Sequence, residues 1–302
     1  MKRFLLKCVV FLVVGFVLHN GLSIWLEAGE GKASGEEGWR SVYKRVIASQ
    51  RSIPGETLVV GDSVGQQLFP FGQARGSLVA NGAVFMVGHY VLAFNALEQN
   101  PQLKRVVYVG VPQVVGHGLE RSRAYTNFIK PFYTFDNFRH FDLPLWTSVA
   151  PHPLVLLAAF PSARHLPLSD PDLDDGVERP IGELSNLASH YIRKLHDLCL
   201  SRGVTFQMVS PPVSTAVRSE TNDWQQMRQQ VRAQGLEAAF GDYLDAIQYL
   251  PPDAFQDGLH LTGSRASAAR RKLTPKVYGL SSTMPRRQPK RTRRKKRKRA
   301  AP

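Results

Sequence analysis

Cysteine is scarce in this chain of 302 residues, which contains only Cys8 and Cys199. Two cysteines exclude the disulfide framework of a small secreted protein and a zinc site built from four thiolates. The histidines show none of the short spacings by which side chains surround a metal ion. We therefore expect no metal and no cofactor. These histidines include His89, His117, His152 and His190.

Acidic residues are also sparse, because 24 Asp and Glu face 39 Lys and Arg and give a formal net charge of +15. Most of the excess lies in residues 286–299, which hold eleven Lys and Arg and no acid. Like charges repel, so we predict a disordered basic tail over residues 276–302. On a cytosolic protein such a tail favours a nucleic-acid partner. Outside the cytoplasm it would meet an anionic polymer or lipid head groups.

An apolar stretch close to the N-terminus is long enough to cross a membrane. Residues 4–26 are apolar apart from four positions, and a spanning helix needs about 20 such residues. Lys2, Arg3 and Lys7 lie at its start, which favours a cytoplasmic N-terminus. The four interrupting positions are Lys7, His19, Asn20 and Ser23.

A cleaved signal peptide is the alternative interpretation, because the run 8–18 has the length of a signal peptide's apolar region. No clean small-x-small cleavage site follows that run. We therefore predict an uncleaved signal anchor, a transmembrane helix over residues 1–26, in the inner or plasma membrane of a single-pass protein. The rest of the chain would be extracytoplasmic (periplasmic), beginning with a linker and a leading helix over residues 27–56.

Strand-like and helix-like segments alternate between residues 57 and 275. Short β-rich apolar runs predict strands, and apolar residues at helical spacing predict helices. This alternation is typical of a parallel sheet covered by helices on both faces. We predict an α/β fold, a three-layer α/β/α sandwich with a mainly parallel sheet. Strands are expected at 57–61, 77–80, 106–111, 204–209 and within 243–249, and helices at 37–51, 87–98, 184–202, 222–234 and 264–273.

An insertion at about residues 112–180 interrupts the alternation. It is rich in proline, histidine and aromatic residues and is too apolar for disorder. It can form a lid or a substrate wall, or its aromatic side chains can pack a subsidiary core, and both interpretations stay open. The aromatic residues include Tyr125, Phe128, Phe132, Tyr133, Phe135, Phe138, Phe141 and Trp146.

Ser63 follows the first expected strand in the sequence Gly61-Asp62-Ser63, where a parallel strand delivers a side chain to the rim of its sheet. Far downstream, Asp257 precedes His260 by three residues. A serine hydroxyl needs a base to take its proton, and the base works best when a carboxylate orients its ring. Ser63, His260 and Asp257 therefore predict a nucleophile, its base and an orienting acid.

Catalysis of this kind also needs hydrogen-bond donors for an oxyanion. The Ser63 amide is one candidate. The backbone of Gly82 or Gly88 and the side chain of Asn81 are further candidates. Asp62 is expected to hydrogen-bond the turn that presents Ser63.

Segments 61–63 and 257–262 together resemble the first and last motif blocks of the SGNH (GDSL) hydrolases. The resemblance extends over about residues 58–273, excluding the insertion. It implies a flavodoxin-like α/β/α fold, a Ser-His-Asp triad, and an oxyanion hole made by the serine amide, a glycine amide and an asparagine side chain.

One middle block departs from that family. The chain has Gly110-Val111-Pro112-Gln113 after the third expected strand, where the family usually shows Gly-x-Asn-Asp. Asn81 or Gln113 would then have to supply the donor of the usual asparagine.

Residues 81–90 and 125–133 also resemble membrane-anchored bacterial members of the superfamily. Such members add or remove acyl groups on cell-envelope polymers, as alginate acetylation proteins and the teichoic-acid D-alanylation protein do. The resemblance implies a serine esterase or O-acyltransferase whose substrate is an acylated exopolysaccharide, peptidoglycan or related envelope glycan. A non-catalytic glycan-binding envelope protein is the first alternative, and a nucleic-acid-binding protein acting through the basic tail is the second.

Overall fold

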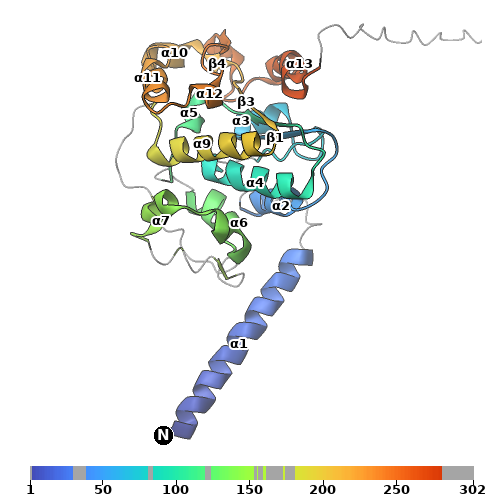
Figure 1. The fold of residues 1–302 in the computed structure, drawn as a ribbon, viewed down its shortest axis with the longest axis vertical. Coiled ribbons are helices and arrows are strands. Elements are labelled where there is room, and N and C mark those ends of the chain that lie inside the picture. Colours follow the sequence, from blue (N-terminus) through green and yellow to red (C-terminus); the bar gives the residue numbers. More distant parts are fainter. Residues whose placement is uncertain are drawn as a thin grey trace, which may run out of the picture.

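The computed structural model in Figure 1 describes residues 2–29, 39–80, 84–119, 124–152, 155, 159–160, 173 and 181–280. Several predictions lie outside these residues. They are residues 30–38 of the predicted linker, the oxyanion candidates Asn81 and Gly82, most of the second half of the insertion, and the basic tail beyond residue 280.

Three short strands form a parallel sheet in the order β1-β2-β3, so the described chain is a mixed α/β protein. Gly61 pairs with Val109, and Val109 pairs with Val209, which brings the carboxyl ends of the three strands to one edge. The strands are rich in valine, whose branched side chain favours extended backbone. Their bounds are Thr57–Gly61 for β1, Arg105–Val109 for β2 and Thr205–Val209 for β3.

The strand predicted at residues 77–80 is reduced to a single bridge. Ser77 bridges Val59 of β1 in parallel, and the amide of Leu78 donates to the Val59 carbonyl at 2.8 Å. Gly76, with φ +68, turns the chain immediately before this contact. The segment therefore touches β1 without extending the sheet.

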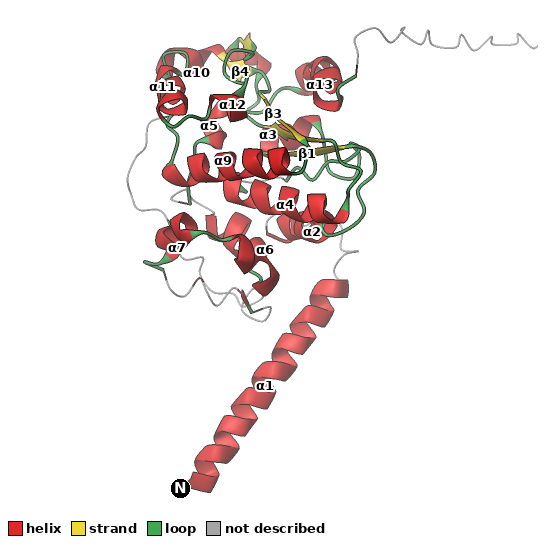
Figure 2. Ribbon diagram, viewed as in Figure 1, coloured by secondary structure: helices red, strands yellow, loops and turns green. Residues whose placement is uncertain are grey.

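The strand side chains alternate between two apolar clusters, so both faces of the sheet are buried. At one face, helix α4 packs on β1, helix α9 packs on β3, and α2 lies against α4 (Figure 2). At the other face, α3 and α13 lie against β1. Leu58, Val60, Val106, Tyr108 and Met208 belong to the first cluster and Val59, Val107, Val109 and Val209 to the second. The helices are α2 (Trp39–Ser49), α3 (Ser63–Leu68), α4 (Phe85–Gln99), α9 (Asn186–Ser201) and α13 (Gly263–Tyr278).

The two large helices of the first face show different sequence patterns for a physical reason. Helix α4 is apolar around most of its circumference because sheet, insertion and neighbouring helices surround it. Helix α9 buries one stripe, including Tyr191, Leu195 and Cys199, and its first turn is capped by the Ser185 hydroxyl, which accepts from the Ala188 amide. Burial raises the pKa of the Cys199 thiol to about 12, as expected for a small apolar core residue.

The described part of the insertion packs into the first cluster as an aromatic core. Phe128 stacks on Phe132 with ring centroids 5.2 Å apart, and Tyr133 contacts Phe141 at 5.0 Å. These aromatic side chains thus pack a core, as one interpretation expected, but they join the main cluster instead of forming a separate, subsidiary one. The elements are α5 (Pro112–Val115), η2 (Tyr125–Ile129), α6 (Lys130–Phe132), η3 (Phe135–His140) and α7 (Leu143–Val149).

A second small sheet lies beyond β3 and carries the chain toward Asp257. It consists of two parallel residue pairs, so the strand expected within 243–249 is shorter and later than predicted. The elements are β4 (Val213–Ser214), α10 (Thr215–Glu220), α11 (Gln225–Ala233), α12 (Glu237–Phe240), β5 (Tyr249–Leu250) and η5 (Pro252–Ala254).

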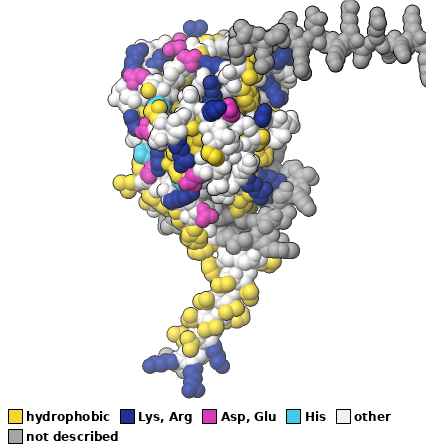
Figure 3. Space-filling model, turned by 45° about the vertical axis from the view of Figure 1, so that its right-hand side comes forward, with side chains coloured by type: hydrophobic (Ala, Val, Ile, Leu, Met, Phe, Trp, Pro, Cys, Tyr) yellow, Lys and Arg dark blue, Asp and Glu magenta, His cyan; other side chains and the backbone are white. Residues whose placement is uncertain are grey.

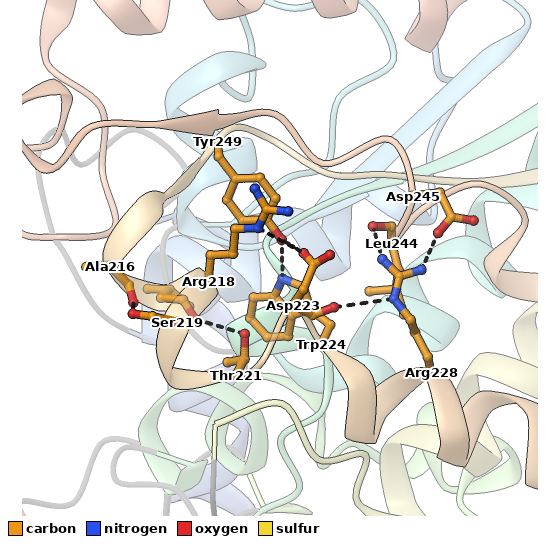
Figure 4. A network of polar contacts seen from close by, with 11 residues as sticks. Ala216, Arg218, Ser219, Thr221, Asp223, Trp224, Arg228, Leu244, Asp245 and Tyr249 are labelled. Carbon is orange, nitrogen blue, oxygen red and sulfur yellow. Dashed lines mark hydrogen bonds and ion pairs between the residues drawn. The ribbon is translucent and has the colours of Figure 1, made fainter.

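A polar network holds this small sheet to the corner between α10 and α11 (Figure 4). Trp224 is fully buried with φ +63, and its indole N–H donates to the Tyr249 hydroxyl at 3.1 Å. That hydroxyl donates to Asp223 Oδ1 at 2.5 Å, and Arg218 lies over the Tyr249 ring. The left-handed turn is therefore stabilised by a buried side chain and a satisfied hydrogen-bond network.

Helix α1 (Lys2–Gly29) is long and apolar enough over Lys2–Leu22 to cross a membrane, a property that signal sequences share. Figure 3 shows hydrophobic side chains along it and Lys and Arg at its N-terminal end. The window that meets this test has none of its residues buried. The Phe16 ring contacts Phe160 at 5.2 Å.

The last helix continues past the domain boundary predicted at residue 275. Helix α13 runs to Tyr278, and Val277 is fully buried in the second cluster. Gly279, with φ +63, then ends the helix. Residues 276–278 thus belong to the folded body, because Val277 supplies core contacts that a solvated tail would lack.

Candidate active site

Ser63 is the first residue of α3, directly after β1, and Asp62 is the N-cap. Asp62 Oδ1 accepts hydrogen bonds from the amides of Val64 and Gly65, both at 2.9 Å. The cap satisfies the second and third amides of the helix and leaves the first, that of Ser63. The local sequence thus presents the Ser63 hydroxyl and its amide together at the carboxyl edge of the sheet.

Asp62 also connects two strand ends. Its Oδ2 accepts from the amide of Val111 at 2.7 Å, in the loop that follows β2. Burial raises the pKa of Asp62 to about 6, against the opposing effect of the three amide hydrogen bonds. The expected hydrogen bonds to the turn are present, and the bond to Val111 is one that the sequence did not indicate.

Two glycines allow the start of α3 to approach β2 closely. A Cβ atom on Gly61 would lie 1.9 Å from the Val109 carbonyl oxygen, and one on Gly65 would lie 2.2 Å from the same atom. Backbone cannot yield to such overlaps as a flexible side chain can. The glycine before Asp62 and the glycine after Val64 are therefore requirements of packing.

The structure brings Ser63, His260 and Asp257 together in one chain of hydrogen bonds. His260 Nε2 lies 3.0 Å from Ser63 Oγ, and His260 Nδ1 lies 2.7 Å from Asp257 Oδ2. Because a carboxylate only accepts, the second contact places the histidine proton on Nδ1. Nε2 is then free to accept the hydroxyl proton of Ser63.

Hydrogen bonds within one short loop hold Asp257 against His260, and these bonds do not involve α3. Asp257 Oδ1 accepts from the amides of Leu259, at 3.0 Å, and His260, at 2.7 Å. The hydrogen bond from the His260 amide is the largest of the effects that lower the pKa of Asp257 to about 2. Gly258 takes φ +78, a conformation that glycine adopts without the strain of a Cβ atom.

The oxyanion candidates are placed unequally. The Ser63 amide lies beside the Ser63 hydroxyl, whereas Asn81 and Gly82 are outside the described residues. Gly88 is buried inside α4, where a Cβ atom would meet Val84 and Phe132, which gives this glycine a packing role.

Gln113 lies in the first turn of α5, close in sequence to the Val111 amide that Asp62 binds. Its Oε1 atom is buried, and no described group donates a hydrogen bond to it. No described group of three or more His, Cys, Asp or Glu side chains is arranged to hold a metal ion.

Gln67 is a further residue near the triad that the sequence did not indicate. It lies on α3, and its side-chain amide is hydrogen-bonded to the backbone of Leu261, the residue after His260. Its spacing of four residues from Ser63 was the available signal, since positions four apart share one face of a helix.

Comparison of the chain with protein-family models, with curated proteins and with solved structures finds no match.

Proposed function

We propose that this protein is a serine esterase or O-acyltransferase of the SGNH type. The observation that carries the proposal is the hydrogen-bonded order Ser63, His260, Asp257, with contacts of 3.0 and 2.7 Å. The serine and histidine are 197 residues apart, so a local sequence preference does not explain their contact. A nucleophile, a base and an orienting acid in this order are the parts required for acyl transfer.

The first chemical step would form an acyl-serine. His260 Nε2 takes the proton of the Ser63 hydroxyl while Oγ attacks the carbonyl carbon of a bound ester. The tetrahedral intermediate then collapses, the bond to the ester's alcohol oxygen breaks, and His260 donates its proton to that alcohol. Asp257 holds the Nδ1 proton in place and stabilises the imidazolium that exists between these transfers.

The second step would release the acyl group. His260 removes a proton from water or from a sugar hydroxyl, whose oxygen attacks the acyl-Ser63 carbonyl. The Ser63 oxygen leaves and regains the proton from His260. Water gives hydrolysis and a sugar hydroxyl gives transfer. In both steps the Ser63 amide, which the Asp62 cap does not bond, would stabilise the oxyanion.

The fold that best accommodates this site is a three-layer, flavodoxin-like sandwich. Support comes from the parallel order β1-β2-β3 and from the two clusters that receive alternating strand side chains. The nucleophile follows the carboxyl end of β1, the edge at which open parallel sheets bind ligands.

We place the body outside the cytoplasm, anchored by α1. The length and composition of α1 support a membrane span, and Lys2, Arg3 and Lys7 support a cytoplasmic N-terminus. This location, together with the resemblance to envelope acyl-transfer proteins, directs the proposal to an acylated exopolysaccharide or cell-envelope glycan.

A fluorophosphonate tests the proposal, because its phosphorus bonds covalently to an activated serine oxygen and releases fluoride. We expect the full chain in detergent to be labelled and Ser63→Ala to remain unlabelled. Ser201→Ala is the matched control, since this exposed serine at the end of α9 bonds only its own helix among the described groups. Labelling of Ser63→Ala equal to that of the wild type contradicts the proposal.

Glycan binding distinguishes the first alternative, a non-catalytic glycan-binding protein, from the proposed enzyme. If the wild type neither labels nor hydrolyses esters, and an acylated glycan binds equally well to Ser63→Ala and His260→Ala, the protein is a non-catalytic glycan-binding protein. Nucleic-acid binding that disappears with residues 281–302, together with a cytoplasmic body, would support the second alternative.

A further inference from the structure

Gln67 forms a two-point contact between the helix of the nucleophile and the loop of the base. Its Nε2 donates to the Leu261 carbonyl at 2.7 Å, and its Oε1 accepts from the Leu261 amide at 3.1 Å. Gln67 lies one helical turn after Ser63, and Leu261 directly follows His260. The contact therefore runs beside the Ser63–His260 hydrogen bond and joins the same two segments.

We propose that Gln67 is a positioning residue that holds His260 within hydrogen-bond reach of Ser63. This inference rests on the proposed function, because it concerns the geometry of the same triad. The side-chain hydrogen bonds of Gln67 go to the Leu261 backbone, so Gln67 would act on His260 through that backbone.

The loop of the base needs such a contact because its own hydrogen bonds are internal. The Asp257 side chain bonds the Leu259 and His260 amides, and the Gln256 amide donates to the His260 carbonyl at 2.7 Å. These bonds fix Asp257 relative to His260. They do not fix either residue relative to Ser63, which belongs to α3.

Apolar packing alone does not fully define the position of His260 relative to Ser63. The Leu261 side chain is fully buried in the second cluster, which also contains Leu68, the residue after Gln67. Such packing is non-directional. A paired donor and acceptor on one residue, Leu261, instead set both the distance and the rotation of the loop against α3.

The amide of glutamine suits this task chemically. It offers one acceptor and one donor at its end, and the Leu261 peptide groups present the complementary pair. An ionised glutamate accepts but cannot donate, so it would face the Leu261 carbonyl with a negative oxygen. Methionine has similar length and shape but makes neither bond.

The test compares Gln67→Met with the wild type in the full chain. We expect Gln67→Met to react with a fluorophosphonate about 10- to 100-fold more slowly, because a displacement of about 1 Å at reacting groups costs up to about 10²-fold. For a small ester, kcat should fall by the same factor while KM changes less than twofold. Gln229→Met is the control, since Gln229 is an exposed glutamine on α11 and should react at the wild-type rate.

Hydrogen exchange of the Leu261 amide gives a readout that does not need catalysis. This amide should be protected in the wild type and exchange at least about tenfold faster in Gln67→Met, whereas amides of the central sheet should be unchanged. The comparison separates a local displacement of the loop from loss of the fold.

Gln67→Glu gives a second variant if Gln67→Met does not fold. Protonated glutamate regains a donor for the Leu261 carbonyl, so its labelling rate relative to the wild type should rise as pH falls toward the ordinary glutamate pKa of about 4.3. A general loss of stability would make this ratio fall or stay constant.

The outcomes separate the two proposals. Labelling of folded Gln67→Met at the wild-type rate overturns the positioning role while the proposed function stands. If the wild type is not labelled above Ser63→Ala, the proposed function fails, and exchange at Leu261 decides the structural contact alone. Unchanged exchange in Gln67→Met overturns that contact, and faster exchange supports it.

Discussion

Asp62 Oδ2 accepts a 2.7 Å hydrogen bond from the Val111 amide, and this bond ties the turn after β1 to the loop after β2. The other carboxylate oxygen of Asp62 caps α3. One buried side chain thus positions the first residue of α3, Ser63, and the neighbouring loop.

Asp62→Asn should destabilise the protein by roughly 1–3 kcal/mol, the cost of leaving a buried donor unpaired. The asparagine oxygen can still cap α3, but its NH2 group would face the Val111 amide, so two donors would meet. The free energy of unfolding in urea measures the effect. Asp253→Asn, an exposed change in η5, is the control, and an equal effect of the two changes would contradict this role for Asp62.

The Asp62 contribution to stability should increase as pH falls. Its folded pKa of about 6 lies above the value of about 3.9 for an unfolded aspartate, so the native state binds this proton more tightly. Between pH 6 and about 4, protonation of Asp62 therefore raises the free energy of unfolding, and the gain is lost as pH rises through 6. The difference between wild type and Asp62→Asn, followed over this range, should show that slope; a difference independent of pH would argue against the raised pKa.

Gly61→Ala should be among the most damaging single changes in β1. The new Cβ would lie 1.9 Å from the Val109 carbonyl oxygen, and main chain must move to relieve it. We expect a loss of about 3 kcal/mol, the upper part of the usual range for overpacking, measured by urea unfolding. Gly263→Ala, where a Cβ meets nothing within 4 Å, is the control and should change stability little.

Asp257→Asn should reduce fluorophosphonate labelling of Ser63 by up to about 10⁴-fold at neutral pH, the loss seen when the orienting acid of a triad is neutralised. The asparagine NH2 group would favour the tautomer with its proton on Nε2, which cannot accept from Ser63. Labelling rates measure the loss. Stability should fall less than in Gly61→Ala because Asp257 is exposed. Wild-type labelling in Asp257→Asn would remove this carboxylate from the mechanism.

The elements that short-range pattern defines were predicted well. Strand β1 has the bounds expected from its apolar run, Thr57–Gly61. The observed first residues of α9 and α13 lie within a few residues of the predicted ones. Each depends on local periodicity, turn residues or caps. The segment 77–80 was expected to be a strand because its composition favours extended backbone. A strand, however, needs a partner over several residues, and the sequence does not show how many residues of this segment pair with β1.

The contacts of the candidate site were predicted to the extent that its residues have recognisable chemistry. Ser63, Asp257 and His260 carry functional groups whose spacing and position point to one another, and the structure places them in contact. Gln67 and the Asp62–Val111 bond were missed because each joins a side chain to a backbone group. Any residue except proline can offer a backbone N–H, so no residue type marks the partner. A helix containing Gly88 was expected, but the packing of this glycine against Val84 and Phe132 depends on tertiary structure.

The separation of 197 residues between Ser63 and His260 has a consequence for the order in which the chain is made. The segment carrying Ser63 leaves the ribosome long before the loop that carries His260. During synthesis and any transfer across a membrane, Ser63 therefore lacks its contact with His260, and an ordinary serine hydroxyl is a weak nucleophile. If the proposed function holds, reactivity at Ser63 would appear only after the loop of His260 has reached α3, so a serine-directed reagent would also report when that contact has formed.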